Sequence, residues 1–318
     1  MNDDFSKTKS GGEVIQMDIL DKYIKKIFSL VDISTIKPMK VVVDTGNGMG
    51  GLMIPKIKQK ISKCEWIHIF PELDGTFPNH EANPLKKENM VALQKAVLEH
   101  EADVGIAYDG DGDRIGFVDE KGEIVSGDFI IALIAGELLK NHQGDIILYD
   151  LRSSNSTKEA INEAGGKPEM CRVGHSLIKR MMKETGALFA GELSSHFYYR
   201  DFYRVESTEL TSLLVLKLIS ESGKTFSELV RPLRKYYQSG EINSDVEDKQ
   251  AKIKELEEKY KEGAASISHL DGVRIDFSDW WFNARPSNTE AKLRLNLEAK
   301  TKELMEEKRD ELLKIIRK

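Results

Sequence analysis

The chain has 318 residues, of which 40% are hydrophobic and 31% charged, a composition typical of soluble globular proteins. This length allows two or three domains with separate hydrophobic cores. The net charge of −6, with acidic and basic residues interspersed, argues against nucleic acid as a partner. No apolar run approaches the roughly 20 residues of a membrane span, so we expect no membrane contact either.

The beginning of the chain is polar. Residues 1–12 lack the apolar core of a signal peptide, and we expect residues 1–14 to be a disordered lead-in. The two cysteines, Cys64 and Cys171, are far apart and lack the spacing of metal ligands. Reduced thiols in a cytoplasmic protein are therefore expected.

Residues 15–125 alternate between helical and strand patterns, which is typical of an α/β domain. Two of the expected strands, at 104–108 and 115–118, are joined by a tight acidic turn. The elements expected before them are a helix over 15–31, a strand at 41–43, a helix from the glycine-rich turn 44–51 to about residue 62, a strand at 66–70 and a helix over 89–99.

The same alternation begins again in residues 126–235, which we interpret as a second α/β domain and a distant repeat of the first. Its expected elements are a helix over 128–140, a strand at 145–150, a helix over 156–164, a strand near 167–173, a helix over 176–183, an apolar segment at 188–190 and a long helix over 209–221.

Residues 235–240 change in composition and are expected to be a linker. Residues 236–318 mix strands with charged helices, as in a small α+β domain. The expected elements are helices over 247–261 and 302–316 and strands at 272–277, 280–283 and 292–298. The predicted fold class is α/β: two similar α/β domains with mixed sheets, followed by a smaller α+β C-terminal domain.

The acidic turn between the first domain's last two strands is the most informative feature. It places Asp109, Asp111 and Asp113 at alternate positions with glycines between them and Arg114 directly after. Three carboxylates this close repel one another unless a cation lies among them. A Mg²⁺ ion held by few carboxylates keeps open positions for phosphate oxygens, and a neighbouring arginine suits the same ligand.

Two other interpretations of this turn remain. A calcium loop between two helices would use Asp109, Asp111, Asp113 and Glu120 at its positions 1, 3, 5 and 12. It needs glycine at position 6, where Arg114 stands, and strands rather than helices flank the turn. The second alternative is a solvated acidic turn without a metal.

The segment 191–196, Gly-Glu-Leu-Ser-Ser-His, follows an apolar strand. On an extended loop Glu192 and Ser194 point the same way, because alternate residues share a face. A carboxylate beside a hydroxyl suits paired hydroxyls of a sugar, and His196 is a potential proton carrier. An ordinary polar turn is the alternative.

Two further segments suit phosphate. The loop 283–290 lies between two strands and combines one cation with hydroxyl, amide and backbone N–H donors. Gly174 and His175 open a helix whose first turn brings Lys179, and a helix N-terminus with cations also suits phosphate. A plain turn in the first case, and a helix capped by Ser176 with solvated bases in the second, are the alternatives.

The glycine-rich turn allows a rival interpretation. Residues 46–51 match the G-x-G-x-x-G pattern of dinucleotide-binding folds, between a strand and a helix. Asp44, however, would place a negative charge beside the pyrophosphate, and a nicotinamide site leaves the acidic turn unexplained.

Four motifs appear in a fixed order, at 43–48, 109–114, 191–196 and 285–289. Together they resemble the α-D-phosphohexomutase family, most closely the bacterial phosphomannomutase/phosphoglucomutases. The similarity extends from about residue 12 to the end, and segments 74–80 and 185–187 also fit. The resemblance implies a four-domain fold with the active site in a central cleft.

The resemblance also implies roles for individual residues. The metal ligands for Mg²⁺ would be Asp109, Asp111 and Asp113. The candidate catalytic residues are Arg114, near the transferring phosphoryl group, and His175. The candidate substrate-binding residues are Arg152, at a position where the family often has lysine, Gly174, Lys179, Glu192, Ser194 and His196, and, for the non-reacting phosphate, Arg285, Ser287, Asn288 and Thr289.

The resemblance implies transfer of a phosphoryl group between C1 and C6 of glucose or mannose phosphates, through a hexose 1,6-bisphosphate. The family's reactive serine lies in a Ser-His-Asn-Pro loop of a first domain, and nothing in residues 1–318 matches it. We therefore expect a truncated chain, inactive or very weak alone, with a separately encoded N-terminal domain as a potential partner.

Two alternatives stay open, a non-catalytic sugar-phosphate-binding protein and a phosphoglucosamine mutase. The run Glu192-Leu193-Ser194 disfavours the second, because the corresponding loop of that enzyme looks different. Smaller departures from the family pattern are Ser195, where glycine is favoured, and segment 206–208, where Asp-(Asp/Ser)-Gly is usual.

Overall fold

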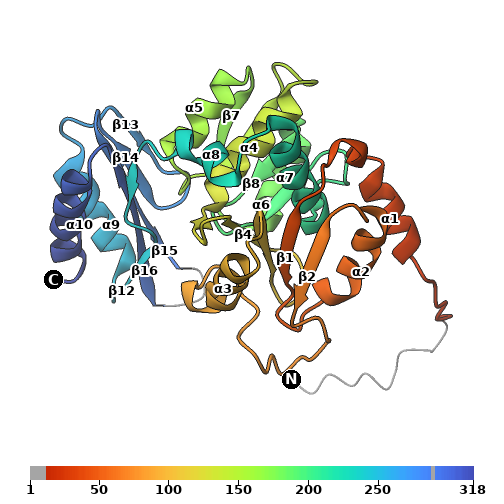
Figure 1. Cartoon of the computed structure of the whole chain (residues 1–318). Helices are drawn as coiled ribbons and strands as arrows, with labels where there is room; N and C mark the ends of the chain where they lie inside the picture. The colour runs from red at the N-terminus through yellow and green to blue at the C-terminus, as the bar shows by residue number, and fades with distance from the viewer. Residues whose placement is uncertain (1–11, 288–290) are drawn as a thin grey trace.

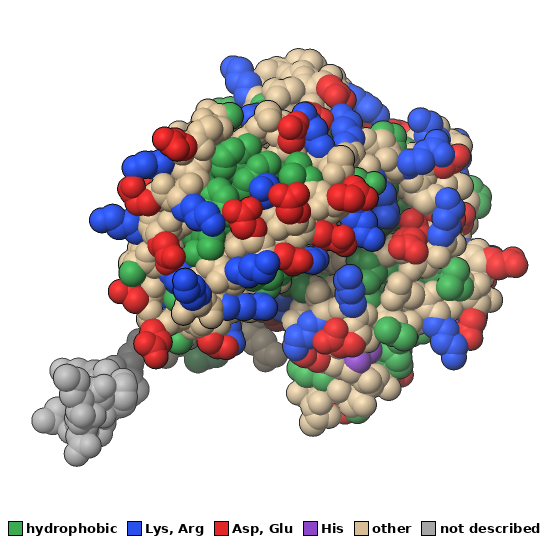
Figure 2. Space-filling view, turned by 90° about the vertical axis from the view of Figure 1, so that its left-hand side faces the viewer, with side chains coloured by type: hydrophobic (Ala, Val, Ile, Leu, Met, Phe, Trp, Pro, Cys, Tyr) green, Lys and Arg blue, Asp and Glu red, His purple; other side chains and the backbone are tan. Residues whose placement is uncertain are grey.

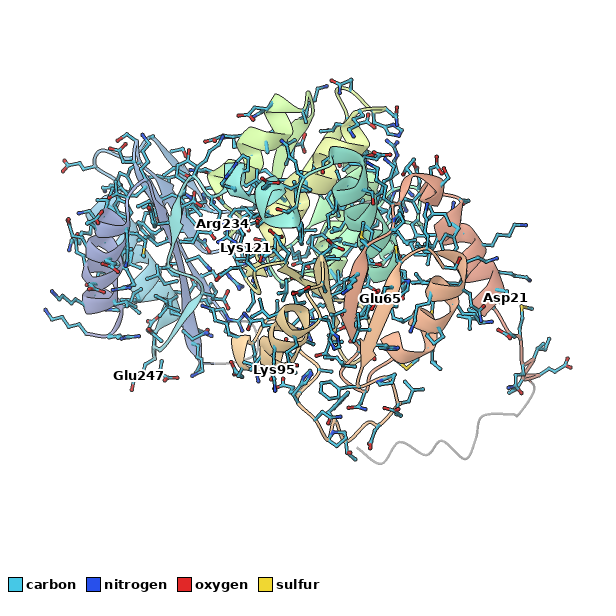
Figure 3. All side chains as sticks on the ribbon, in the orientation of Figure 1. Asp21, Glu65, Lys95, Lys121, Arg234 and Glu247 are labelled. Carbon is cyan, nitrogen blue, oxygen red and sulfur yellow. The ribbon has the colours of Figure 1, made fainter. Side chains whose placement is uncertain are left out.

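The computed structural model describes residues 12–287 and 291–318, which form three β-sheets with their helices (Figure 1). We name the parts after these sheets: the first unit is residues 20–125, the second 127–233 and the third 237–316. Asp21 in the first unit and Glu247 in the third lie at opposite ends of the molecule (Figure 3).

The first unit has the strand order β2-β1-β3-β4-β5. β1 pairs parallel with β2 and β3, whereas β3–β4 and β4–β5 are antiparallel. Val41, Val42 and Val43 of β1 are fully buried, as expected for a central strand covered on both faces. The elements are α1 (Leu20–Phe28), η2 (Ile33–Thr35), β1 (Lys40–Asp44), α2 (Gly50–Lys60), β2 (Glu65–Ile69), η3 (Lys87–Met90), α3 (Val91–Glu99), β3 (Val104–Tyr108), β4 (Ile115–Asp119) and β5 (Ile124–Val125).

The second unit repeats this topology. Its sheet has the order β7-β6-β8-β9-β10, with β6 parallel to β7 and β8 and the last two pairs antiparallel. The repeat expected from the sequence is thus present in the strand order. The elements are α4 (Gly127–Leu139), β6 (Ile146–Asp150), α5 (Asn155–Glu163), β7 (Lys167–Cys171), α6 (His175–Thr185), β8 (Phe189–Gly191), β9 (Phe197–Tyr199), β10 (Val205–Glu206), α7 (Thr208–Ser222), α8 (Phe226–Val230) and η4 (Arg231–Leu233).

The third unit is an antiparallel sheet with the order β11-β16-β15-β14-β13, to which β12 adds by pairing with β16. Its two long helices lie on the outer side of this sheet, at the left of Figure 1. The elements are β11 (Tyr237–Gln238), β12 (Ile242–Asp245), α9 (Lys249–Tyr260), β13 (Ser266–Ser268), β14 (Val273–Asp276), β15 (Trp280–Pro286), β16 (Lys292–Ala299) and α10 (Lys302–Ile316). The predicted fold class is confirmed.

The hydrophobic cores do not correspond one to one with the three sheets. The first and second units share one hydrophobic core, which contains Phe117 of β4 and Phe189 of β8. Helix α4 is buried along most of its length in this core. The third unit has its own core around Phe282 and Leu295. It meets the second unit through polar contacts, such as the Arg274 Nη1 donor 2.6 Å from the Leu151 carbonyl oxygen.

Two local predictions were wrong. The helix expected over 15–31 covers only Leu20–Phe28. Val14 and Ile15 are exposed, so burial of their side chains does not stabilise an earlier turn. The linker expected at 235–240 contains β11, whose Tyr237 and Gln238 pair with the end of β16. An edge strand this short leaves no apolar pattern in a sequence.

The surface matches the interspersed charges of the sequence. On the side seen in Figure 2, lysines and arginines alternate with aspartates and glutamates, and no area of a single sign stands out. None of the helices formed by the described residues combines the length and apolar composition needed to cross a membrane.

Candidate active site

The acidic turn joins β3 to β4. Asp109 is fully buried at the end of β3, Asp111 is exposed and Asp113 is half-buried. One carboxylate oxygen from each of the three lies within 4.8 Å of the others. Three hard oxygen ligands that converge in this way fit a small divalent cation with open positions for other ligands.

Asp109 also organises the turn. Its Oδ1 accepts hydrogen bonds from the backbone N–H groups of Gly112 (3.0 Å) and Arg114 (3.1 Å), and its Oδ2 accepts one from Arg114 Nε (2.7 Å). Burial raises the pKa of Asp109 to about 6, although the bonds from Arg114 act in the opposite direction. Arg114 Nη1 donates to Asn83 Oδ1 (3.2 Å), so the guanidinium is held from two sides.

The glycine-rich turn 46–51 packs against the acidic turn. Met49 N–H donates to the Gly110 carbonyl oxygen (3.0 Å), and a Cβ at Gly48 would lie 2.7 Å from that oxygen. Asp44 Oδ1 accepts from Gly46 N–H (2.8 Å), while its Oδ2 lies 3.0 Å from His80 Nε2. The glycines therefore serve close backbone packing beneath the acidic turn, which gives the dinucleotide interpretation no support.

The segment 192–196 joins β8 to β9 and lies directly beside the acidic turn. Ile115 N–H donates to the Ser195 carbonyl oxygen (3.1 Å). His196 Nε2 lies 3.5 Å from Asp113 Oδ2, and its Nδ1 lies 3.3 Å from Glu192 Oε2. Burial alone would lower the pKa of His196, but the hydrogen bond with Asp113 and the charge of Glu192 raise it. His196 thus connects the predicted metal ligands to the predicted sugar-binding residues.

Glu192 is buried and engaged within the protein. Its Oε1 accepts from Gly174 N–H (3.0 Å), and its Oε2 accepts from Tyr198 O–H (2.7 Å). An ionised carboxylate has about four acceptor sites, so these bonds leave lone pairs for a sugar hydroxyl. Ser194 is more accessible, and its Oγ accepts from Arg152 Nη2 (3.1 Å).

Arg152 reaches Ser194 from the end of β6. It is buried and paired with Asp150, whose Oδ2 lies 2.7 Å from Arg152 Nη2. The same Asp150 oxygen accepts from Leu193 N–H (2.7 Å), so one carboxylate fixes both the arginine and the 192–196 segment. Arg152 Nη1 points towards the third unit, 3.6 Å from Glu241 Oε2.

The third unit contributes Arg285 and Ser287, at the end of β15. Both are buried. Arg285 Nη2 donates to Glu241 Oε2 (2.7 Å), and Ser287 Oγ accepts from Arg294 Nη2 (3.3 Å). Asn288 and Thr289, predicted to complete this phosphate site, lie outside the described residues.

At the start of α6, two of the groups predicted to bind phosphate are already engaged within the protein. Gly174 adopts φ 124° and has committed its N–H to Glu192. Lys179 Nζ pairs with Glu206 Oε2 at 2.7 Å. His175 is exposed at the first residue of the helix. The roles predicted for these residues therefore stay predictions.

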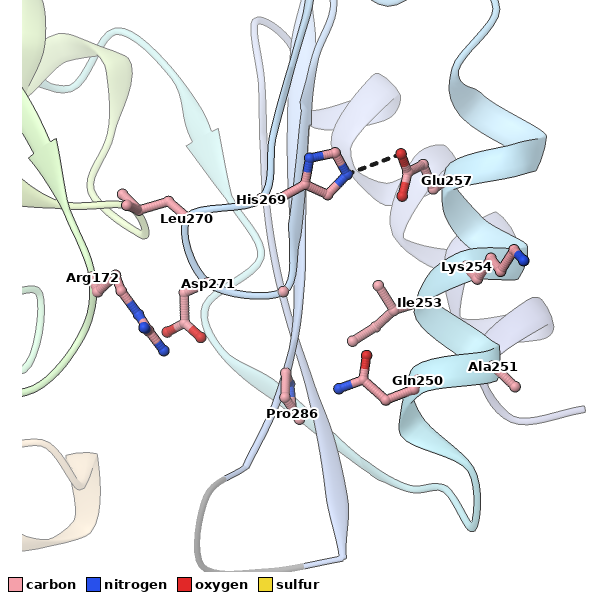
Figure 4. Close-up of a pocket in the computed structure, with 11 residues that line it drawn as sticks. Arg172, Gln250, Ala251, Ile253, Lys254, Glu257, His269, Leu270, Asp271 and Pro286 are labelled. Atoms are coloured by element: carbon pink, nitrogen blue, oxygen red, sulfur yellow. Dashed lines mark hydrogen bonds and ion pairs between the residues drawn. The ribbon is translucent and has the colours of Figure 1, made fainter.

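A pocket of about 670 Å³ separates the second unit from α9 of the third (Figure 4). Arg172, which follows β7, faces Asp271 across one end, and at the other His269 Nε2 lies 2.9 Å from Glu257 Oε1. Pro286 lines the pocket beside the predicted phosphate loop. Solvent therefore reaches the junction between the two units next to that loop.

Several residues that support these segments were not predicted as site residues: Asp44, Asn83, Asp150, Glu241 and Arg294. Only Asp44 and Asp150 carried a usable signal. Each ends an apolar strand, and both carboxylates accept an N–H from two residues further on. Asn83 and Glu241 reach the site through tertiary packing alone.

Comparison with known proteins gives one family along the chain. Models of phosphoglucomutase/phosphomannomutase domain II, domain III and the C-terminal domain match residues 21–122, 126–237 and 241–315. The chain is 39% identical over 297 residues to "Phosphohexose mutases" of Xanthomonas campestris, covering 93% of this chain and 66% of that protein. It is 38% identical over 311 residues to a phosphomannomutase of Salmonella montevideo, covering 96% of this chain and 68% of that protein.

A solved structure agrees with the sequence matches. The crystal structure of a phosphoglucomutase/phosphomannomutase family protein from Burkholderia thailandensis superimposes with a TM-score of 0.85 at 31% identity, covering 95% of this chain and 64% of that one. The chain thus spans about two thirds of the length of these relatives. From the domain models, the relatives and the shared fold together, we conclude that the chain belongs to the phosphoglucomutase/phosphomannomutase family.

Proposed function

We propose that this chain provides the metal, sugar and phosphate sites of a phosphohexomutase. The reaction moves a phosphoryl group between C1 and C6 of glucose or mannose through a hexose 1,6-bisphosphate. One observation carries the proposal: His196 joins the acidic turn to the 192–196 segment, and Arg152 joins that segment to Glu241 beside Arg285. Groups suited to a cation, a sugar and a phosphate are therefore contiguous.

The acidic turn would hold Mg²⁺ through Asp109, Asp111 and Asp113. When bound, the ion would offset negative charge on the transferring phosphoryl group. Arg114 would bind oxygens of the same group, because Asp109 and Asn83 fix its guanidinium while its side chain stays 26% exposed. This positioning needs no side-chain rearrangement, which favours catalysis by orientation and charge.

The remaining groups would position the sugar and its second phosphate. Ser194 and Glu192 would bind sugar hydroxyls, with Arg152 holding the serine hydroxyl in place. Arg285 and Ser287 would bind the non-reacting phosphate together with Asn288 and Thr289, and His175, Gly174 and Lys179 would approach it from α6. His196 would carry a proton between the two segments that it contacts.

The phosphoryl donor itself would lie on another segment, because residues 1–318 contain no Ser-His-Asn-Pro sequence. We therefore propose that turnover requires a serine-bearing domain added to this chain. The test compares conversion of glucose 1-phosphate to glucose 6-phosphate, with Mg²⁺ and glucose 1,6-bisphosphate, with and without that domain. Turnover is expected only with the domain, and fast turnover by the chain alone contradicts this proposal.

The same missing motif favours one alternative, a sugar-phosphate-binding protein without catalysis. Calorimetry of glucose 1-phosphate binding to the purified chain separates the possibilities. Binding together with reconstituted turnover supports the mutase, whereas binding without turnover in any combination supports the alternative. Absence of both Mg²⁺ and hexose phosphate binding contradicts the two proposals alike.

A further inference from the structure

Glu241 lies among three arginines from two units. Its Oε2 is 2.7 Å from Arg285 Nη2 and 3.6 Å from Arg152 Nη1, and its Oε1 is 3.6 Å from Arg294 Nη1. The glutamate follows Gly240, whose φ of 68° turns the chain between β11 and β12. Its side chain is 26% exposed, so solvent and ligands reach it.

The arginines need an anion at this position. Arg152 and Arg285 are nearly inaccessible, and buried guanidinium groups are costly unless charge and hydrogen bonds compensate them. Asp150 neutralises Arg152, but the other carboxylate near Arg285, that of Asp271, is 4.0 Å away. Among the described residues, Glu241 is therefore the closest carboxylate to Arg285.

Arg285 is still incompletely satisfied. Its Nε is buried and has no hydrogen-bond partner within the described part of the chain. An unpaired buried donor carries a desolvation cost that a ligand acceptor removes. Phosphate and carboxylate oxygens both fit the guanidinium fork, so a phosphate that satisfies Nε would compete with Glu241 for the same group.

We infer that Glu241 is an internal competitor for substrate phosphate: its carboxylate pairs with Arg152, Arg285 and Arg294 until a phosphate takes its place. The inference rests on the proposed function in taking the anion to be the non-reacting phosphate of a hexose phosphate. The exchange breaks the ion pairs of Glu241 and forms ion pairs with phosphate, so the arginines keep an anionic partner throughout. Glu241 is a positioning residue in this scheme, because it acts through the arginines.

If Glu241 competes with phosphate, removing its charge should strengthen phosphate binding, which a purely structural role does not predict. Glu241→Gln removes the internal anion and leaves the arginines in excess, so phosphate should bind more tightly, by about tenfold, as for a typical coupling between two sites. A residue that merely holds the arginines in place would weaken binding when changed. Without ligand the variant should melt at a lower temperature, and saturating phosphate should reduce the difference.

Isothermal titration calorimetry of the whole chain with glucose 1-phosphate, and separately with inorganic phosphate, tests the inference. The matched control is Glu247→Gln, the same change at an exposed position of the third unit. Its affinity should equal that of the wild type. Glu241→Asp keeps the charge but withdraws it from the arginines, and should tighten binding by about threefold; it keeps the test decisive if the glutamine variant does not fold.

The outcomes separate the two proposals. Binding by the wild type with equal or weaker binding by folded Glu241 variants overturns the competitor role and leaves the proposed function standing. If Glu241→Gln binds the anions and the wild type does not, the competitor role is supported, because Glu241 then excludes them completely. Binding of neither anion to any of these proteins overturns both the inference and the proposed function.

Discussion

The first and second units share one topology but differ in what their equivalent loops do. In both, an aspartate ends the central parallel strand and accepts the N–H of the second residue after it, Gly46 for Asp44 and Arg152 for Asp150. Asp44 is then paired with a histidine and Asp150 with a buried arginine. The repeat thus fixes where a carboxylate stands. Its side-chain partner differs, being a titratable histidine in the first unit and a permanently charged arginine in the second.

The hairpins of the two units show the same division. The β3–β4 turn carries three carboxylates, whereas the β8–β9 turn carries Glu192, Ser194 and His196. They meet where Ile115 N–H donates to the Ser195 carbonyl oxygen. A duplicated framework therefore brings two chemically different turns together, as the proposed sugar-phosphate substrate would require.

The largest expected effect comes from breaking the Asp150–Arg152 ion pair of the second unit. Asp150→Asn leaves Arg152 buried without its principal counter-ion and weakens the bond to Leu193 N–H. We expect a loss of about 3–5 kcal/mol in the free energy of unfolding, measured by urea denaturation. Asp44→Asn is the matched change in the first unit and should cost about 1–2 kcal/mol, because His80 can become neutral. Equal losses of unfolding free energy in the two variants would contradict the proposed difference between Asp44 and Asp150.

The next effect concerns the metal. Asp111→Asn removes an exposed carboxylate from the acidic turn and should weaken Mg²⁺ binding by at least about tenfold in calorimetry. Its stability should change little, since Asp111 is exposed. Ser194→Ala, in the other hairpin, should leave Mg²⁺ affinity unchanged. An equal loss in both variants would show that the hairpins do not divide the chemistry as proposed.

A third effect concerns the bend in each hairpin. Gly112 and Ser195 have φ values of 82° and 68°, in the left-handed region that favours glycine. Gly112→Ala should therefore destabilise the protein by about 1–2 kcal/mol, whereas Ser195→Gly should stabilise it by up to about 1 kcal/mol. Urea denaturation of both variants measures the two changes in unfolding free energy. Destabilisation by Ser195→Gly would mean that its side-chain contacts outweigh the strain.

How much the sequence predicts depends on whether the signal is local. Buried strands such as β1 and β3 were predicted because their apolar runs are continuous. β13 was missed, since two of its three residues are exposed and a short edge strand needs no pattern. The three aspartates were found because one turn contains them all. Glu241 was missed because its arginines come from positions 152, 285 and 294.

The smallest expected effect is the pH dependence that the His80–Asp44 pair of the first unit gives to the unfolding free energy. The hydrogen bond to Asp44 raises the pKa of His80 above its usual range, despite burial. Because the folded pKa is raised, the stabilisation is complete below the unfolded pKa of about 6.5 and is lost as pH rises through the folded pKa. Wild type and His80→Gln should thus differ in unfolding free energy by up to about 1 kcal/mol more at pH 5.5 than at pH 8.5. The Asp150–Arg152 pair has no such group, since arginine stays charged throughout. A difference that is constant across this range would show that His80 is not protonated beside Asp44.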